Sequence, residues 1–282
     1  MPERYGSILL AADKKQHITR PLTENDLNRI HIPGNMNVAD APLTVHLTNW
    51  LYASDLHIPL HNRTYLERLI RVGKHAGIKH LVIGGDLFDF QSLSEHPKED
   101  REVGYDDSKR VAGRILRLLG EDFHLYIVPG NHDRRYAKRL GGYIDFKDLI
   151  WAALAGERTK YPITVSNNDY IYINEGEAGW VVGHPRFFST IPAKGGAEVA
   201  MIQRRNVCGA HNHIIGMMQS KCGNFWAVDP GHMTEPAMTP YKVRSEGLSK
   251  FPAWRPGFML VQNNIPQIMT DGLVDWQAYG AE

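Results

Sequence analysis

The chain has 282 residues, which is enough for one large domain or for one domain with an appendage. Its composition is that of a soluble globular protein, and the formal net charge of +1 provides no overall field that would draw it onto nucleic acid or a membrane. The two cysteines, Cys208 and Cys222, exclude a disulfide framework, and no apolar run is long enough to cross a bilayer, so we expect a cytoplasmic protein without membrane contact.

The first 44 residues are mixed and polar, and prolines interrupt them. We predict one short helix there, at 23–30, and interpret 1–44 as an N-terminal arm or small appendage without a core of its own. The remaining residues, 45–282, are predicted to form a single catalytic domain.

Short apolar segments alternate with amphipathic ones in the first half of that domain. The pattern predicts strands at 49–53, 80–83 and 123–128 and helices at 64–76 and 108–119. A charged insertion, 91–107, separates the second strand from the second helix, and we expect it to form a rim over a site.

The second half is richer in strands. We expect strands at 170–173, 180–182, 206–208, 225–228 and 258–261, and helices near 145–154 and 196–203. This alternation predicts an α/β fold with crossover connections. Trp50 and Trp151 are both expected in the core, and Cys208 is expected to be a small buried hydrophobe.

Five polar clusters follow five of the predicted strands. Because ligands bind beyond the carboxyl ends of strands in open α/β sheets, we expect these clusters to meet in space. Gly-Asn-His-Asp is the most specific of them, since a simple turn seldom needs all four residues. In chain order the clusters are Asp55-Leu56-His57, Gly85-Asp86-Leu87-Phe88-Asp89, Gly130-Asn131-His132-Asp133, Gly183-His184 and His211-Asn212-His213.

The residue types in these clusters are those of a metal site. Carboxylate, imidazole and amide oxygen together fit Mn, Fe, Zn, Co or Ni better than Ca or Mg alone, and the absence of thiolate argues against structural zinc. Asp86 has two oxygens with which to bridge two ions, and such a pair clamps a phosphate and generates a bridging hydroxide. The candidate ligands are Asp55, His57, Asp86, Asn131, His184, His211 and His213.

From Leu51 to His213, this pattern resembles the calcineurin-like metallophosphoesterase family. The resemblance implies a four-layer αββα sandwich of two mixed β-sheets flanked by helices. It also implies that Asp55, His57 and His213 hold one ion, that a second ion is held by Asn131, His184 and His211, and that Asp86 bridges them. His132 would be the proton donor, and Asp89 would orient its ring. We consider Asp133 at least as well explained as a loop carboxylate that binds backbone amides.

One position departs from the family pattern. Ala210 precedes the final His-x-His where the family usually has glycine. If that position needs a positive φ angle, alanine would be strained there.

A closer similarity is to phage and prophage metallophosphoesterases, which would place the protein in a host cytoplasm. It rests on the segments Phe90–Pro97 and Asn131–Arg135. It implies little about the substrate.

Three further residues are candidates for substrate contacts. Arg134 belongs to a basic run after the catalytic loop, Arg186 follows His184, and His61 lies close to the Asp-x-His motif. Each has an equally simple role on a solvated surface.

These observations predict a phosphoesterase with two divalent ions, manganese favoured, that attacks its substrate with a metal-bridging hydroxide and protonates the leaving group from His132. We favour a phosphodiesterase acting on a nucleotide or nucleic acid. A phosphomonoesterase, including a protein phosphatase, remains an alternative, and a non-catalytic metal-binding scaffold is a third. The sequence leaves the oligomeric state, the native metal and the natural substrate open.

Overall fold

The computed structural model describes residues 41–94, 103–142, 144–186, 189–239 and 254–281. The helix predicted at 23–30 and the middle of the predicted insertion, 95–102, lie outside these residues.

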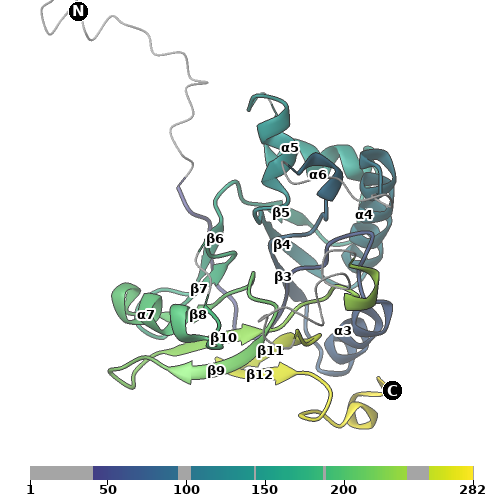
Figure 1. Ribbon diagram of the computed structural model, residues 1–282. Coiled ribbons are helices and arrows are strands. Elements are labelled where there is room, and N and C mark those ends of the chain that lie inside the picture. Colours follow the sequence, from purple (N-terminus) through teal and green to yellow (C-terminus); the bar gives the residue numbers. More distant parts are fainter. Residues whose placement is uncertain (1–40, 95–102, 143, 187–188, 240–253, 282) are drawn as a thin grey trace, which may run out of the picture. The chain divides into compact units, whose positions relative to one another are not determined.

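Two six-stranded mixed sheets form the centre of the fold (Figure 1). The first contains, in spatial order, β12 (Ile265–Met269), β11 (Phe258–Gln262), β2 (Trp50–Ala53), β3 (His80–Gly84), β4 (His124–Val128) and β5 (Ile163–Val165). The second contains β1 (Thr44–Val45), β6 (Tyr170–Ile173), β7 (Trp180–Gly183), β8 (Asn206–Cys208), β10 (Trp226–Pro230) and β9 (Ile215–Gln219).

Helices cover the outer face of each sheet. α3 (Arg63–His75), α4 (Tyr105–Gly120) and α6 (Phe146–Leu154) pack on the first sheet, and α7 (Lys194–Gln203) packs on the second (Figure 1). The fold is therefore the expected α/β arrangement of four layers. Among the described residues, the remaining helical elements are α5 (Arg134–Arg139) and the short 3-10 helices Gln91–Leu93, Pro236–Met238 and Trp276–Tyr279.

Strand β2 shows how the layers are built. All four of its residues are buried, because alternate side chains enter two different cores. Trp50 and Tyr52 face the second sheet, while Leu51 and Ala53 face the helices. Trp50 packs edge-on against Trp180 of the other sheet with their ring centroids 5.7 Å apart. The pairing of large aromatic rings holds the two sheets face to face.

Helix α3 illustrates the local signals. Asn62 caps its first turn by accepting a hydrogen bond from the Tyr65 backbone N–H at 3.0 Å. Leu66, Leu69 and Val72 recur at helical spacing and are buried against the first sheet. The helix connects β2 to the parallel strand β3, and α4 connects β3 to the parallel strand β4.

Parallel pairing sets the position of the site. Strands β2, β3 and β4 run parallel, so their carboxyl ends lie along one edge of the first sheet. Strands β7 and β8 are also parallel to each other in the second sheet. The five predicted polar clusters follow these five strands.

The predicted elements of the domain are present with shifted bounds, and several were missed. Helix α4 begins three residues earlier than predicted. Strands β1, β5, β9 and β12 and the short helix α5 were not predicted.

The expectation that Trp151 is a core residue is wrong, because its side chain is 45% exposed on the outer face of α6. Cys208 is buried, as expected. Within the described ranges, no helix combines the length and apolarity needed to cross a membrane.

The contact between α4 and α6 provides a test of the packing. A Cβ atom added at Gly113 would lie 2.0 Å from the Ala153 carbonyl oxygen, so the two helices would have to separate. We expect Gly113→Ala to lower the free energy of unfolding by about 1–3 kcal/mol. Arg114→Ala, on the exposed side of the same helix, should change it by less than about 0.5 kcal/mol. Urea unfolding measures both, and equal stability of the two variants would contradict this packing.

Candidate metal centre

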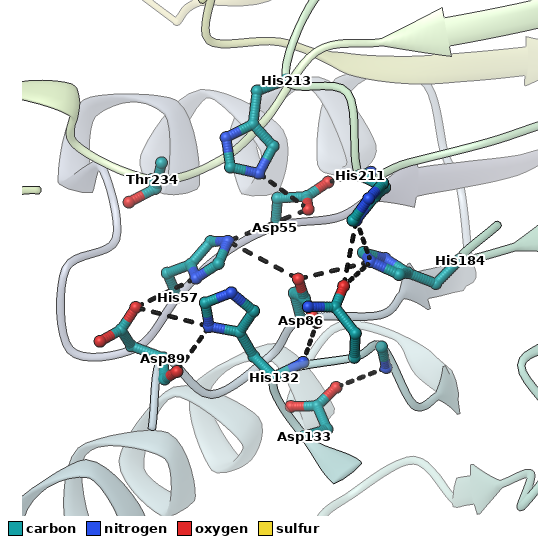
Figure 2. Close-up of polar contacts among 12 residues, drawn as sticks. Asp55, His57, Asp86, Asp89, His132, Asp133, His184, His211, His213 and Thr234 are labelled. Carbon is teal, nitrogen blue, oxygen red and sulfur yellow. Dashed lines mark hydrogen bonds and ion pairs between the residues drawn. The ribbon is translucent and has the colours of Figure 1, made fainter. Parts of the chain in front are cut away.

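The five polar clusters converge where the edges of the two sheets meet (Figure 2). Backbone pairing between the loops after β2 and β3 continues beyond the strands. The Asp55 N–H donates to the Gly85 carbonyl and the His57 N–H donates to the Asp86 carbonyl, each at 3.0 Å. The Asp-x-His and Gly-Asp motifs are therefore held in register by the same kind of bond as the sheet itself.

Two glycines in these motifs permit the close approach. A Cβ at Gly85, whose φ is +99°, would lie 2.6 Å from the Cβ of His184 in the other sheet. A Cβ at Gly130 would lie 2.1 Å from the Asp86 carboxylate. Any side chain at either position would separate the loops that carry the candidate ligands.

Asp55, His57 and His213 form the first group of candidate ligands. His213 Nε2 lies 3.0 Å from Asp55 Oδ1, and His57 Nε2 lies 3.9 Å from the same oxygen. All three side chains are buried, and their ligand atoms lie within 4.8 Å of one another, so one ion can be shared among them.

Asp86, His184 and His211 form a second group whose ligand atoms also lie within 4.8 Å of one another, although His211 is only half-buried. Asn131 lies beside this group. Asn131 Oδ1 lies 2.9 Å from His184 Nε2 and 3.0 Å from His211 Nδ1. Asp86 Oδ2 lies 3.3 Å from His184 Nε2 and 3.9 Å from His57 Nε2 of the first group. The Asp86 carboxylate therefore stands between the two groups, where a bridging ligand is required.

The charges in the site fit divalent cations. Asp55 and Asp86 are 0% and 2% exposed, and burial raises the pKa of Asp86 to about 7. Burial alone would lower the pKa of His57, but Asp89, Asp86 and Asp55 together raise it to about 9. His57 Nε2 is buried without a hydrogen-bond partner. Two buried carboxylates, one of them with a raised pKa, beside an imidazole nitrogen that lacks a hydrogen-bond partner form a donor set that two metal ions would satisfy.

Five of the candidate ligands have left-handed backbone conformations, which non-glycine residues seldom adopt. Such conformations persist only where surrounding structure enforces them, and they concentrate at functional sites. Here they turn the side chains back across the sheet edges. The residues and their φ angles are Asp55 (51°), His57 (46°), Asp86 (48°), His211 (78°) and His213 (58°).

The concern about Ala210 was misplaced. Ala210 is buried and does not adopt a positive φ, and neither does Gly209 before it. The left-handed turn falls one residue later, at His211. Alanine is therefore accommodated at this position without backbone strain.

His132 lies beside both groups, and its ring contacts His57 edge-on with centroids 4.4 Å apart. Its Nδ1 is 2.6 Å from the backbone carbonyl of Asp89, to which we assign the donated hydrogen bond. The Asp89 carboxylate lies farther from it, at 3.8 Å, and is closer to His57 Nδ1, at 3.2 Å. The main chain of Asp89, rather than the carboxylate expected from the motif, makes the shorter contact with the His132 ring.

Asp133 ties two site loops together. Its buried carboxylate accepts backbone hydrogen bonds from Gly130 at 2.8 Å, from Phe88 at 2.9 Å and from Leu87 at 3.3 Å. Burial and the nearby Asp86 raise its pKa to about 6, while these bonds act in the opposite direction. Asp133 therefore binds backbone amides of the loops, which is one of the two roles considered for it from the sequence.

The predicted substrate-contact residues are not all in one place. Arg134 and Arg186 are brought together by Asp169, whose two carboxylate oxygens each pair with one guanidinium group. His61 pairs through its backbone with Thr234, which Figure 2 shows on the His57 side of the centre. The structure therefore forms a paired-arginine rim near His184 and places His61 apart from it.

The sequence interpretation missed three residues around the site. Asp169 was not considered, Trp254 packs edge-on against His213 with centroids 4.0 Å apart, and Thr234 is buried near His57. For Thr234 the sequence signal was partial, because it follows the strand predicted at 225–228. The parallel pairing of β10 with β8, which brings the segment after Pro230 to this edge, is visible only in the structure.

A family model described as calcineurin-like phosphoesterase matches residues 50–209. Among solved structures, Yfce, a phosphoesterase from E. coli, is similar at 17% identity and a TM-score of 0.40, covering 80% of this chain and 100% of that chain. TT1561 of Thermus thermophilus is similar at 12% identity and a TM-score of 0.42, covering 79% of this chain and 99% of that chain. A single mutant of Vps29 from Entamoeba histolytica is similar at 17% identity and a TM-score of 0.38, covering 80% of this chain and 96% of that chain. No curated protein matches the chain.

We expect Asp133→Asn to loosen the site. An amide offers one acceptor oxygen where the carboxylate accepts three N–H groups, so a buried donor is left without a partner, at about 1–3 kcal/mol of unfolding free energy. Affinity for added Mn²⁺ should fall as well. Urea unfolding in chelator and calorimetric metal titration measure the two effects.

Asp145→Asn is the matched control, because asparagine caps helices as well as aspartate does. Asp145 caps α6 by accepting the Asp148 N–H at 2.8 Å. This variant should stay within about 0.5 kcal/mol of the parent. Equal effects of the two substitutions would refute the loop-tying role of Asp133.

Proposed function

Because the chain belongs to the calcineurin-like phosphoesterase family, whose members are metal-dependent phosphoester hydrolases, we propose that it is a phosphodiesterase acting on a nucleotide or a nucleic acid. The observation that supports this most directly is the pair of ligand groups joined at Asp86 with His132 beside them. A third cluster, of His57, Asp86 and His132, has its ligand atoms within 4.8 Å of one another, which supports a role for His132 beside Asp86.

Seven residues would hold two divalent ions, as assigned above from the two groups. When bound, such ions neutralise the charge of a phosphate and activate water at neutral pH. Manganese is the first ion to test, because the donor set mixes carboxylate, imidazole and amide oxygen without thiolate. The protein itself contributes the fixed orientation of these donors and the burial that strengthens their charges.

His132 is the proposed proton donor to the leaving group. With Nδ1 bound to the Asp89 carbonyl, Nε2 is the other ring nitrogen, and it would have to exchange its contact with Arg135 Nη2, at 3.0 Å, for the substrate. Burial, then His57 and Arg135, hold its pKa well below the ordinary value. An incoming phosphate would act in the opposite direction, since a nearby negative charge favours imidazolium.

The paired arginines favour a diester over a monoester. Arg134 and Arg186 share the single carboxylate of Asp169, so the rim carries a net charge of about +1 from these three groups. One excess positive charge suits a singly charged diester better than a terminal phosphate dianion.

One observation keeps the phosphomonoesterase alternative in view. Arg135 lies across the His132 ring, with Nη2 3.0 Å from Nε2 and Nη1 2.8 Å from Nδ1. A guanidinium group beside the proposed proton donor is well placed to bind a terminal phosphate.

Model substrates distinguish the two alternatives. With Mn²⁺ added, we expect bis-p-nitrophenyl phosphate to be cleaved at least about tenfold faster than p-nitrophenyl phosphate, and neither to be cleaved in chelator. Cleavage of the monoester alone would establish the phosphomonoesterase instead. Failure with both substrates, in protein shown to contain two metals per chain, would support the non-catalytic scaffold.

The proton-donor role has its own test. His132→Ala should lower kcat by about 10²–10⁴-fold on a dinucleotide, whose alkoxide leaving group needs a proton. The loss should be much smaller on bis-p-nitrophenyl phosphate, whose phenolate departs readily. Metal content should stay at two ions per chain, whereas Asp86→Asn should reduce it. Equal losses on both substrates would exclude His132 as the proton donor.

A further inference from the structure

A cavity of about 290 Å³ lies on the outer face of the second sheet, next to the candidate metal centre. Ile171 and Ile173 of β6 point toward the first sheet, so the alternate residues Tyr170 and Tyr172 point outward. They form one side of the cavity, and Val199 of helix α7 lies on another.

The walls are aromatic and aliphatic. Tyr170 and Tyr172 contact each other edge-on with centroids 5.4 Å apart, and Arg205 holds the Tyr172 ring with its guanidinium carbon 4.7 Å from the ring centroid. Val181 and Val207 provide the aliphatic surface between the tyrosines and α7. These are fixed, flat surfaces of the kind on which a planar ring stacks.

The cavity also has polar groups at its edge. Asp169 and Arg186 both line it, and Arg186 is 83% exposed, so part of its guanidinium group faces solvent. Gln203 adds an exposed amide from the end of α7. An amide and a guanidinium group offer hydrogen bonds to the edge of a heterocyclic ring.

His184 connects this cavity to the metal centre. It lines the cavity and also belongs to the second group of candidate metal ligands. A phosphate at that group and a ring in the cavity would therefore lie around the same strand end, with Arg186 beside them. The volume is near the lower limit for small-molecule sites, which suits one ring system and excludes a folded segment of a partner.

We propose that this cavity binds the nucleobase of a nucleotide whose phosphate lies at the metal centre. The proposal rests on the phosphoesterase function proposed above and specifies its substrate class as base-bearing phosphate esters. Tyr170, Tyr172 and the valines contact the faces of the base, and Arg186 and Gln203 contact its edge.

The test compares adenosine 5′-monophosphate with ribose 5-phosphate, which has a hydroxyl group in place of the base. Both are assayed as inhibitors of bis-p-nitrophenyl phosphate hydrolysis by the manganese-loaded full chain. We expect adenosine 5′-monophosphate to inhibit at least about fivefold more tightly, since stacking of one base is worth about 1–3 kcal/mol. Equal inhibition by the two ligands would overturn the proposal.

Two variants locate the effect. Val199→Trp fills the cavity from the half-buried side of α7, and Tyr170→Ala removes one wall. Each should bring the two inhibition constants within twofold of each other and leave that of ribose 5-phosphate unchanged. Ile202→Trp, which is 74% exposed on the same helix and outside the cavity, is the control and should retain the preference. A preference retained in both cavity variants would place the base elsewhere and refute the proposal.

Calorimetric titration of the same two ligands separates this proposal from the proposed function. If the protein hydrolyses neither model substrate but still binds adenosine 5′-monophosphate in preference, and Val199→Trp abolishes that preference, the cavity assignment stands while the hydrolase assignment fails. If the protein hydrolyses the model substrates with manganese but shows no preference for the base, the hydrolase assignment stands and the cavity assignment fails.

Discussion

The burial of two carboxylates, Asp55 and Asp86, is the constraint on which the site depends. Charges without access to water are stable only with a compensating partner, and the surrounding groups here are mostly imidazoles whose pKa burial itself lowers. Divalent cations would compensate these carboxylates, and the Nε2 of His57, which has no hydrogen-bond partner, would be one of their ligand atoms.

The sheets create this situation, and the loops maintain it. Parallel strands in each sheet bring the five polar segments to the carboxyl ends of neighbouring strands, and Trp50 packs against Trp180 between the two sheets. The ligands then leave their strands through left-handed turns, which extended strands do not favour. Backbone pairing between Asp55 and Gly85, and the three amides bound by Asp133, hold those turns in place.

Much of this arrangement could be predicted, because motif and strand coincide in the sequence. The apolar segments before Asp55, Asp86 and Asn131 identify buried strands, and the parallel topology then brings the motifs together. Other features depend on contacts between distant residues. Nothing near Asp169 indicates that it joins two arginines, and only the folded backbone shows that the Asp89 carbonyl lies closer to His132 than its carboxylate does.

Short edge strands were missed for a related reason. No residue of β9 is fully buried, and β12 alternates between exposed and half-buried residues up to the buried Met269, so neither shows the continuous apolar run that identified the central strands. Trp151 was assigned to the core because of its size, but the helix turns it outward while Leu149 and Ile150 fill the interior. Size alone does not determine the buried face of a helix.

The order in which the ligands occur along the chain has a consequence for biosynthesis. Asp55 and His213 share the first group but are 158 residues apart, so the ribosome completes most of the domain before both of these candidate ligands exist. The second group likewise requires His184 and His211 from the other sheet. A nascent chain that has completed only strands β2 to β5 therefore contains the carboxylates of Asp55 and Asp86 but lacks His184, His211 and His213. Metal bound by both groups would thus be acquired late in synthesis, and it would join an early-made segment of the protein to a later one.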